Sequence, residues 1–252
     1  MPVDWRIERL RLTTFIPSDL TRQVPSWWRD IVGEDPPTQT VQHGVGAAHA
    51  GPIRNGHCQL ILEVKAGRVD WLLAPPNPID ATSALAGFPQ FDNLAGGVAI
   101  YRELLVPWAA RIEDTRRIAV GAILTAQTEN KLVAYQALQE LLPHVEIDPE
   151  NSSELLYQIN RHARSRHLPE LHLNRLSHWS AVRLKLLQLQ LSAGAPTAAF
   201  STDQPELHAV RLQLDINTDA ERTDALPSGT IQPLVEELLG LGISIAEHGD
   251  QS

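Results

Sequence analysis

The sequence has little of the covalent and metal-binding chemistry that supports small or secreted folds. Its 252 residues include one cysteine, Cys58. A single thiol excludes a disulfide framework within the chain, and it excludes zinc fingers and cysteine-rich iron–sulfur sites. A chain of this length buries roughly three quarters of its unfolded surface, so its core needs no such support. We therefore expect an ordinary globular protein whose thiol is reduced.

Long apolar runs are also missing. No stretch of about 18 apolar residues could span a bilayer, and the start of the chain lacks the basic and apolar pattern of a signal peptide. Residues 247–252 have the composition of a frayed polar tail. These features predict a cytoplasmic protein without membrane association.

Positive charge is in short supply. The chain has 21 Lys and Arg against 30 Asp and Glu, a formal net charge of −9. That balance repels nucleic-acid phosphates and argues against a general nucleic-acid partner. The sequence also lacks a phosphate loop, a dinucleotide fingerprint, a His-Glu-x-x-His motif and a Gly-x-Ser-x-Gly elbow. We accordingly predict no cofactor and no metal, and we lean away from an enzyme.

The first half of the chain shows a regular succession of patterns. Alternating residues predict a strand over 9–16, and helical spacing follows at Leu20, Val24, Trp27, Trp28 and Ile31 before Gly33. Pro25 either kinks this helix or moves its start to Ser26. After a three-stranded meander, a helix is expected over 97–113, with Pro107 bending or breaking it.

The meander is the clearest local signal. Asn55-Gly56 and Ala66-Gly67 are tight-turn sequences separated by one strand length. A two-residue loop at Ala66-Gly67 pairs Glu63 with Asp70 and Leu62 with Trp71. One face then carries the apolar side chains, Cys58 among them, and the other is mostly wet.

The same order of patterns returns in the second half. A strand is expected over 117–126, a helix capped by Thr128 follows, and strands are expected near 155–160, 182–191 and 209–216. Within 182–191, the apolar residues change from one face of the strand to the other at Leu186-Leu187, which indicates a bulge. A helix over this stretch is the alternative. A final helix starts near Thr230 with Pro233 in its first turn.

These patterns predict an α+β protein made of two antiparallel-sheet halves with the order β-α-β-β-β-α, packed as pseudo-repeats. The halves are residues 1–114 and 115–252. No residue-level similarity accompanies this internal duplication of pattern. Two packed lobes and one continuous antiparallel sheet backed by helices both satisfy it.

Three local features allow both a functional and a structural interpretation. His57 precedes Cys58, but neighbours on a strand point to opposite faces, so Cys58 is better explained as a buried hydrophobe. Glu63 opposite Asp70 could hold a cation, yet Lys65 and Arg68 offer diagonal salt bridges. One of the Trp27-Trp28 rings is expected in the core and the other against a neighbour, a partner or a ligand, with packing favoured.

The strongest functional feature is a basic segment over residues 161–185. It has six Arg and Lys and one Glu, a local charge of +5 that leaves −14 for the rest of the chain. Its four histidines are spaced too irregularly for a metal site. A basic segment on an acidic body suits an acidic partner. We predict that it binds a protein partner or a small acidic ligand through Arg161, Arg164, Arg166, His167, Arg175 and His178.

Three stretches resemble a family of uncharacterised, sporadically distributed bacterial proteins. They are 12–17 with the Trp27-Trp28 pair, 148–153 with 158–160, and 212–218. This resemblance implies a bacterial cytoplasmic protein, and it implies no activity and no functional residues. The doubled arrangement is also similar to small-molecule-binding folds in which a ligand lies between two related halves.

Two hypotheses about function lead, and a third, nucleic-acid binding through the 161–185 segment alone, ranks last because of the net negative charge. In the first, the chain is a non-catalytic binding or interaction protein, and the 161–185 segment is exposed and contiguous. In the second, it is a hydrolase-like enzyme with a scattered site between the halves, where two or more of five side chains converge: His57, Glu63, Asp70, His162 and His208.

Overall fold

A computed structural model shows one large antiparallel sheet and, in the part of the chain that it describes, four helices. The structure describes residues 3–16, 24–42, 46–76, 87–185, 188–190, 199–201 and 206–250. The helices are α1 (Val24–Val32), α3 (Leu94–Ala109), α4 (Lys131–Leu141) and α5 (Ile231–His248). None of the described helices is long and apolar enough to cross a membrane.

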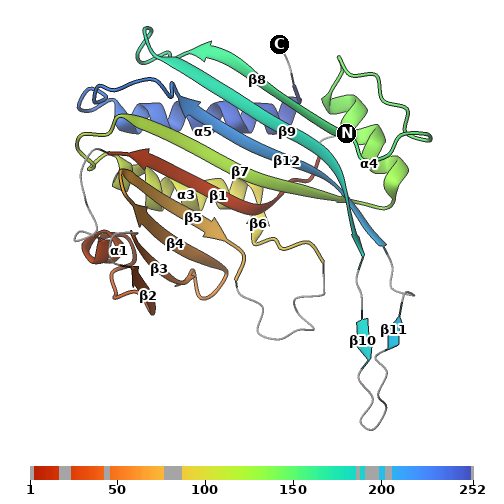
Figure 1. Cartoon of the computed structure of the whole chain (residues 1–252), viewed down its shortest axis with the longest axis horizontal. Helices are drawn as coiled ribbons and strands as arrows, with labels where there is room; N and C mark the ends of the chain where they lie inside the picture. The colour runs from red at the N-terminus through yellow and green to blue at the C-terminus, as the bar shows by residue number, and fades with distance from the viewer. Residues whose placement is uncertain are drawn as a thin grey trace.

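The sheet runs through the whole chain in the order β2-β3-β4-β5-β1-β7-β12-β9-β8, with β6 paired to β1 (Figure 1). Its strands are β1 (Arg6–Phe15), β2 (Thr38–Gln42), β3 (Gly46–Ile53), β4 (Cys58–Lys65), β5 (Arg68–Ala74), β6 (Asp92–Asn93), β7 (Arg117–Thr128), β8 (Leu156–Arg164), β9 (His172–Lys185) and β12 (Glu206–Thr218). A separate two-stranded ribbon joins β10 (Gln188–Gln190) to β11 (Ala199–Ser201). Because β1 pairs with β7, the chain forms the continuous-sheet alternative and not two lobes.

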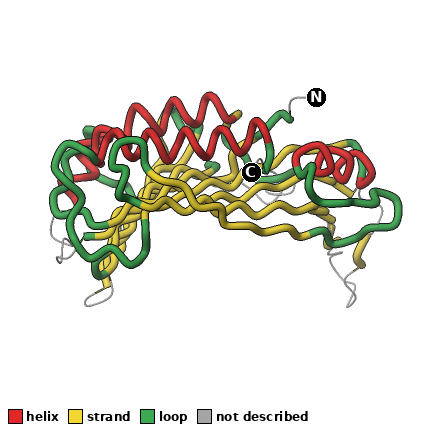
Figure 2. Tube along the Cα trace, turned by 90° about the horizontal axis from the view of Figure 1, so that it is seen from above, coloured by secondary structure: helices red, strands yellow, loops and turns green. Residues whose placement is uncertain are grey.

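The helices all lie on one side of the sheet (Figure 2). Helices α3 and α5 cover its centre, α1 packs on β3 and β4, and α4 packs on β9 and β12. The strand ends bend away from the helices, so the opposite face is concave and carries no helix.

Alternating side chains divide each strand between these two faces. Leu10 and Leu12 of β1 are buried under the helices, as are Leu212 and Leu214 of β12. Burial of such apolar area is the main favourable contribution to folding. The odd residues of β1, by contrast, face the concave side, beginning with Arg9.

The tryptophan pair is packed inside the molecule. Both rings are buried inside the molecule. Trp28 stacks on Trp71 with ring centroids 6.2 Å apart, and Trp27 meets the edge of Trp108 at 5.6 Å. The favoured packing interpretation is confirmed, because the second ring also packs against a neighbour, Trp108 of α3, and the alternative of a partner or ligand falls away.

The meander is confirmed to the residue. β4 pairs with β5 in the predicted register, with Glu63 opposite Asp70 and Leu62 opposite Trp71. Asn55 and Gly56 both have positive φ in the preceding turn, as does Gly67 in the next. The two turn sequences therefore determined the local register.

Several boundaries differ from the predicted ones. The described part of helix α1 starts at Val24, with Pro25 as its second residue, and residues 17–23 before it lie outside the described part of the chain. Asn130, not Thr128, caps α4, because its side-chain oxygen accepts from the Val133 N–H at 3.0 Å. Of the predicted strand 182–191, residues 182–185 are the end of the longer β9 and residues 188–190 form β10. The expected bulge at residues 186–187 and the Leu20 turn of the first helix lie outside the described residues.

The expected polar tail is partly ordered in the structure. Helix α5 continues to His248, and Asp250 is buried. The frayed-tail expectation is thus wrong for residues 247–250, because Asp250 has partners that are distant in sequence.

Candidate ligand-binding site

The helix-free face of the sheet is basic, although the chain is acidic. By strand register, it carries eight Arg and Lys residues and four Asp and Glu residues: Arg6, Arg9, Arg11, Lys65, Arg68, Arg117, Arg164 and Arg211, with Glu8, Glu63, Asp70 and Asp215. The formal charge of this face is +4, against −9 for the chain. The negative charge is therefore concentrated elsewhere, and the concave face attracts anions.

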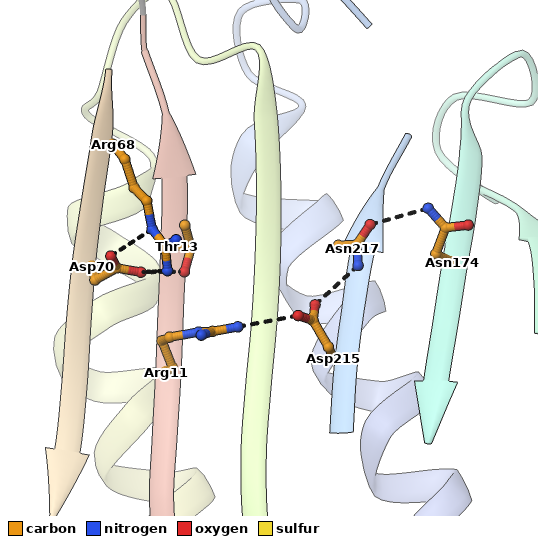
Figure 3. Close-up of polar contacts among 7 residues, drawn as sticks. All are labelled: Arg11, Thr13, Arg68, Asp70, Asn174, Asp215 and Asn217. Carbon is orange, nitrogen blue, oxygen red and sulfur yellow. Dashed lines mark hydrogen bonds and ion pairs between the residues drawn. The ribbon is translucent and has the colours of Figure 1, made fainter. Parts of the chain in front are cut away.

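Two of the four carboxylates pair within β4 and β5. Asp70 is 4% exposed and accepts hydrogen bonds from the Thr13 hydroxyl at 2.5 Å and from Arg68 at 2.9 Å (Figure 3). Glu63 pairs with Lys65 at 3.4 Å. Each pair lies within a single strand, Arg68 with Asp70 in β5 and Lys65 with Glu63 in β4, and not diagonally between the strands as expected. The two cations neutralise the carboxylates that stand opposite each other in the register.

A second network of polar side chains crosses β7 and connects β1 with β12 and β9. The Arg11 guanidinium lies over Gly121 of β7 and donates to Asp215 at 3.2 Å. A Cβ on Gly121 would lie 3.2 Å from the Arg11 Nε, so the absence of a side chain leaves room for this crossing. Asn217 donates to Asp215 at 2.9 Å, and Asn174 donates to Asn217 at 3.1 Å. The network holds Arg11 flat against the sheet.

A neighbouring row of polar side chains has no such partners. Arg9, Gln213, His178 and Gln158 come from β1, β12, β9 and β8, and they stand in one row of the register with Ile123 of β7. None of the four makes a hydrogen bond or ion pair with the described part of the chain. Strands are about 4.8 Å apart, so the row extends over roughly 19 Å.

This row lines a pocket of about 270 Å³ on the concave face. Ile123 and Leu176 provide apolar surface, and Arg11 and Asp215 form the adjoining wall. An open pocket with apolar surface and a few unpaired polar groups is the usual form of a small-molecule site. Arg9 can bind a carboxylate or phosphate with two parallel N–H donors, while the amides and the imidazole can bind oxygens.

The basic segment does not form one exposed surface. Arg161 and Arg175 lie on the helix side of the sheet, and Arg164 lies on the other side. Arg166 and His167 stand in the loop between β8 and β9. Of the six predicted binding residues, only His178 lines the pocket. Strand alternation separates residues that are adjacent in sequence, which corrects the expectation of a contiguous patch.

Arg161 departs most clearly from its predicted role as a binding residue, because it is paired within the protein. Its guanidinium binds both oxygens of buried Asp250, at 2.6 and 2.9 Å. Tyr157 donates to the same carboxylate at 2.9 Å. Arg161 therefore stabilises the fold and is not a free cation.

The five side chains of the hydrolase hypothesis are dispersed. His57 lies 3.2 Å from Asp92, and Glu63 and Asp70 have the partners described above. The pocket at Arg9 contains none of the five, and a second pocket of about 370 Å³ beside α4 contains only His208. That site is therefore dropped. Among the described residues, no group of three or more His, Cys, Asp or Glu is arranged to hold a metal.

Cys58 is buried among apolar neighbours, as the sequence suggested. Burial raises the pKa of its thiol to about 11. Since the thiolate is the reactive form, we expect iodoacetamide to leave Cys58 unmodified at neutral pH and to alkylate it in denaturant, as read by intact mass. Rapid alkylation of the folded protein would contradict this placement.

Comparison with known proteins adds no identification: no family model, curated protein or solved structure matches the chain. The site therefore has to be judged from its own geometry.

Sequence reasoning missed most of this site. Arg9 and Gln213 belong to strands that the sequence predicts, but there they only alternate with the apolar residues and have no predicted role. Gln158 and His178 belong to strands that it located in part or missed. The available signal was the alternation itself, but the strand order that aligns these residues is not visible in a single sequence.

Proposed function

We propose that this chain is a non-catalytic binding protein for a small acidic ligand, held in the concave pocket of the sheet. The observation that carries the proposal is the row of Arg9, Gln213, His178 and Gln158, four unpaired polar side chains from four strands. Gln213 and His178 are half-buried, whereas Arg9 and Gln158 are exposed, so all four groups are accessible and none is engaged by the described part of the chain. Their donors and acceptors are therefore available to a ligand.

The chemistry of the row suggests how the ligand lies. Arg9 binds its carboxylate or phosphate, and Gln213 and His178 bind oxygens further along. Ile123 and Leu176 contact its apolar part. Because the anion-binding group stands in a pocket of about 270 Å³, a small molecule fits it better than a flat protein surface does.

The test uses isothermal titration calorimetry with citrate, L-glutamate and inorganic phosphate as probes. We expect at least one probe to bind the wild-type protein and Arg9→Ala to weaken it by about tenfold or more, as a charge-assisted hydrogen bond contributes roughly 1.5–3 kcal/mol. Arg6→Ala is the matched control. Arg6 lies on the same strand and face but pairs with Asp4, outside the pocket.

Equal weakening by Arg6→Ala would mean that only the general positive potential of the face attracts the anion. Binding that is unaffected by Arg9→Ala, or no binding of any of the three probes, would contradict the proposed site.

We also propose that residues 1–114 and 115–252 are duplicated halves in a cytoplasmic bacterial protein. Support comes from the strand order, since β1-β5-β4-β3 leads outward on one side of the centre and β7-β12-β9-β8 on the other. A helix follows the first strand and the last strand of each half. On this interpretation the pocket lies at the junction, mainly in the second half.

A further inference from the structure

Strand β8 ends the sheet with an open edge. It is nine residues long, Leu156–Arg164, and pairs only with β9 (Figure 1). Its outward backbone groups make no hydrogen bond with any other described segment. Native edge strands are commonly protected by shortness, proline, a bulge or charged side chains, lysine above all. Strand β8 has no proline, lysine or bulge, and of its two arginines Arg161 is neutralised by Asp250. At the opposite edge, β2 is only five residues long.

We propose that two copies of the chain associate through this edge, β8 against β8, antiparallel about a twofold axis at Asn160. Asn160 is the middle residue of the strand, so this register pairs all nine residues with the second copy. The interface is isologous, which is the commonest geometry of homodimers. It joins the two sheets into one continuous sheet.

The side chains of β8 are compatible with themselves in this register. On the helix-free face, Leu156 stands opposite Arg164 of the partner subunit, and Gln158 stands opposite His162 of the partner subunit. On the helix side, Ile159 stands opposite Arg161 of the partner subunit. No two like charges are directly opposed, whereas moving the axis to Arg161 would oppose two guanidinium groups.

The same register explains an exposed apolar side chain. Leu156 is 67% exposed, the most exposed of the large hydrophobic residues in the described part of the chain. The aliphatic stem of Arg164 from the second copy covers it. The charge of Arg161 is already neutralised by Asp250, so it adds little repulsion near the axis.

Dimerisation would also complete the ligand pocket. Gln158 is the last member of the unpaired row and stands at the sheet edge. The partner's His162 would continue the row beyond it and close the open end of the pocket. This consequence rests on the proposed function, whereas the pairing of β8 does not.

The experiment places a positive or a negative charge at Asn160, on the proposed twofold axis, and measures the molar mass by size-exclusion chromatography with light scattering. Wild type is expected at twice the mass of the chain. Asn160→Lys and Asn160→Asp each place like charges opposite themselves, so each variant should run as a monomer. An equal mixture of the two should restore the dimer. Asn160 is exposed, so circular dichroism of both variants should match that of wild type.

His162→Glu is the matched control, because it adds a charge to the same edge but places it opposite Gln158 of the partner subunit and not opposite itself. This variant should stay dimeric. A wild-type chain that remains monomeric at the highest concentration it tolerates would overturn the proposal. A dimer that withstands both Asn160 substitutions would overturn it as well. Neither measurement uses a ligand, so either failure leaves the binding of citrate, glutamate or phosphate to be judged separately.

Discussion

An Arg161→Ala variant should lose about 3 kcal/mol of unfolding free energy in urea denaturation. Asp250 is 5% exposed and receives two hydrogen bonds from Arg161. Removing one partner of a buried ion pair costs more than the pair contributes, because the remaining charge is left without compensation. Tyr157 still donates one hydrogen bond to the carboxylate, which limits the loss.

The backbone explains why Asp250 lies beneath β8. Gly249 ends α5 with φ of +76°, and the Asp250 N–H donates to the Leu141 carbonyl at 2.9 Å. A Cβ at Gly249 would lie 2.0 Å from that carbonyl oxygen. Only glycine permits this approach, so the end of α5 is held against the end of α4 and Asp250 is directed to Arg161.

The same pair predicts a pH dependence. The Arg161 guanidinium, through its hydrogen bonds, lowers the pKa of Asp250 below its ordinary value. The stabilisation is therefore fully present above the pKa of the unfolded state, about 4, and is lost as pH falls through the lower pKa of the folded state. Wild type should lose more stability than Arg161→Ala between pH 5 and the acid limit.

Arg166→Ala is the control for both measurements, because Arg166 follows the same strand, is exposed and lies outside the proposed β8 interface. Its substitution should change the unfolding free energy by less than about 0.5 kcal/mol. Equal losses in the two variants, or an Arg161→Ala variant as stable as wild type, would show that Asp250 does not depend on its ion pair.

Trp28→Ala should have the largest effect on stability, about 3–5 kcal/mol. Trp28 is fully buried, stacks on Trp71 and lies 6.4 Å from the buried ring of His49. Its indole N–H has no hydrogen-bond partner among the described residues. The loss therefore reflects packing and the cavity left behind, not a broken hydrogen bond.

Trp28→Phe separates the two contributions. It keeps an aromatic ring against Trp71 and removes the unpartnered N–H, so it should cost clearly less than alanine. Leu132→Ala, at a side chain that is 41% exposed, should be nearly neutral. Denaturant midpoints of the three variants check this order. A Trp28→Ala protein as stable as Leu132→Ala would contradict the placement of the ring.

Local patterns in the sequence were sufficient where neighbours along the chain decide the structure. Ala66-Gly67 set the register of β4 and β5 because a two-residue loop leaves a single alignment of the flanking alternation. The start of α5 after Thr230 followed from a proline in the first turn. The beginning of β9 was missed, since residues 172–178 mix polar and apolar side chains on both faces.

Patterns along the chain were insufficient for the candidate site. Grouping basic residues by sequence placed Arg161 and Arg164 in one patch, but they stand on opposite faces of the sheet. The row that lines the pocket draws one residue from each of four strands, and Arg9 and Gln158 are 149 positions apart. Such a row exists only once the strands are aligned.

By itself, the sequence determined the absence of disulfides, the α+β class, the order of most elements and the local registers, because these depend on composition and on contacts a few residues apart. Tertiary structure decided that β1 pairs with β7, that Asp250 meets Arg161, and that the basic side chains collect on the helix-free face. These depend on strand order and on which face the helices cover. Both follow from burying one continuous core, whose contacts join residues distant in the chain.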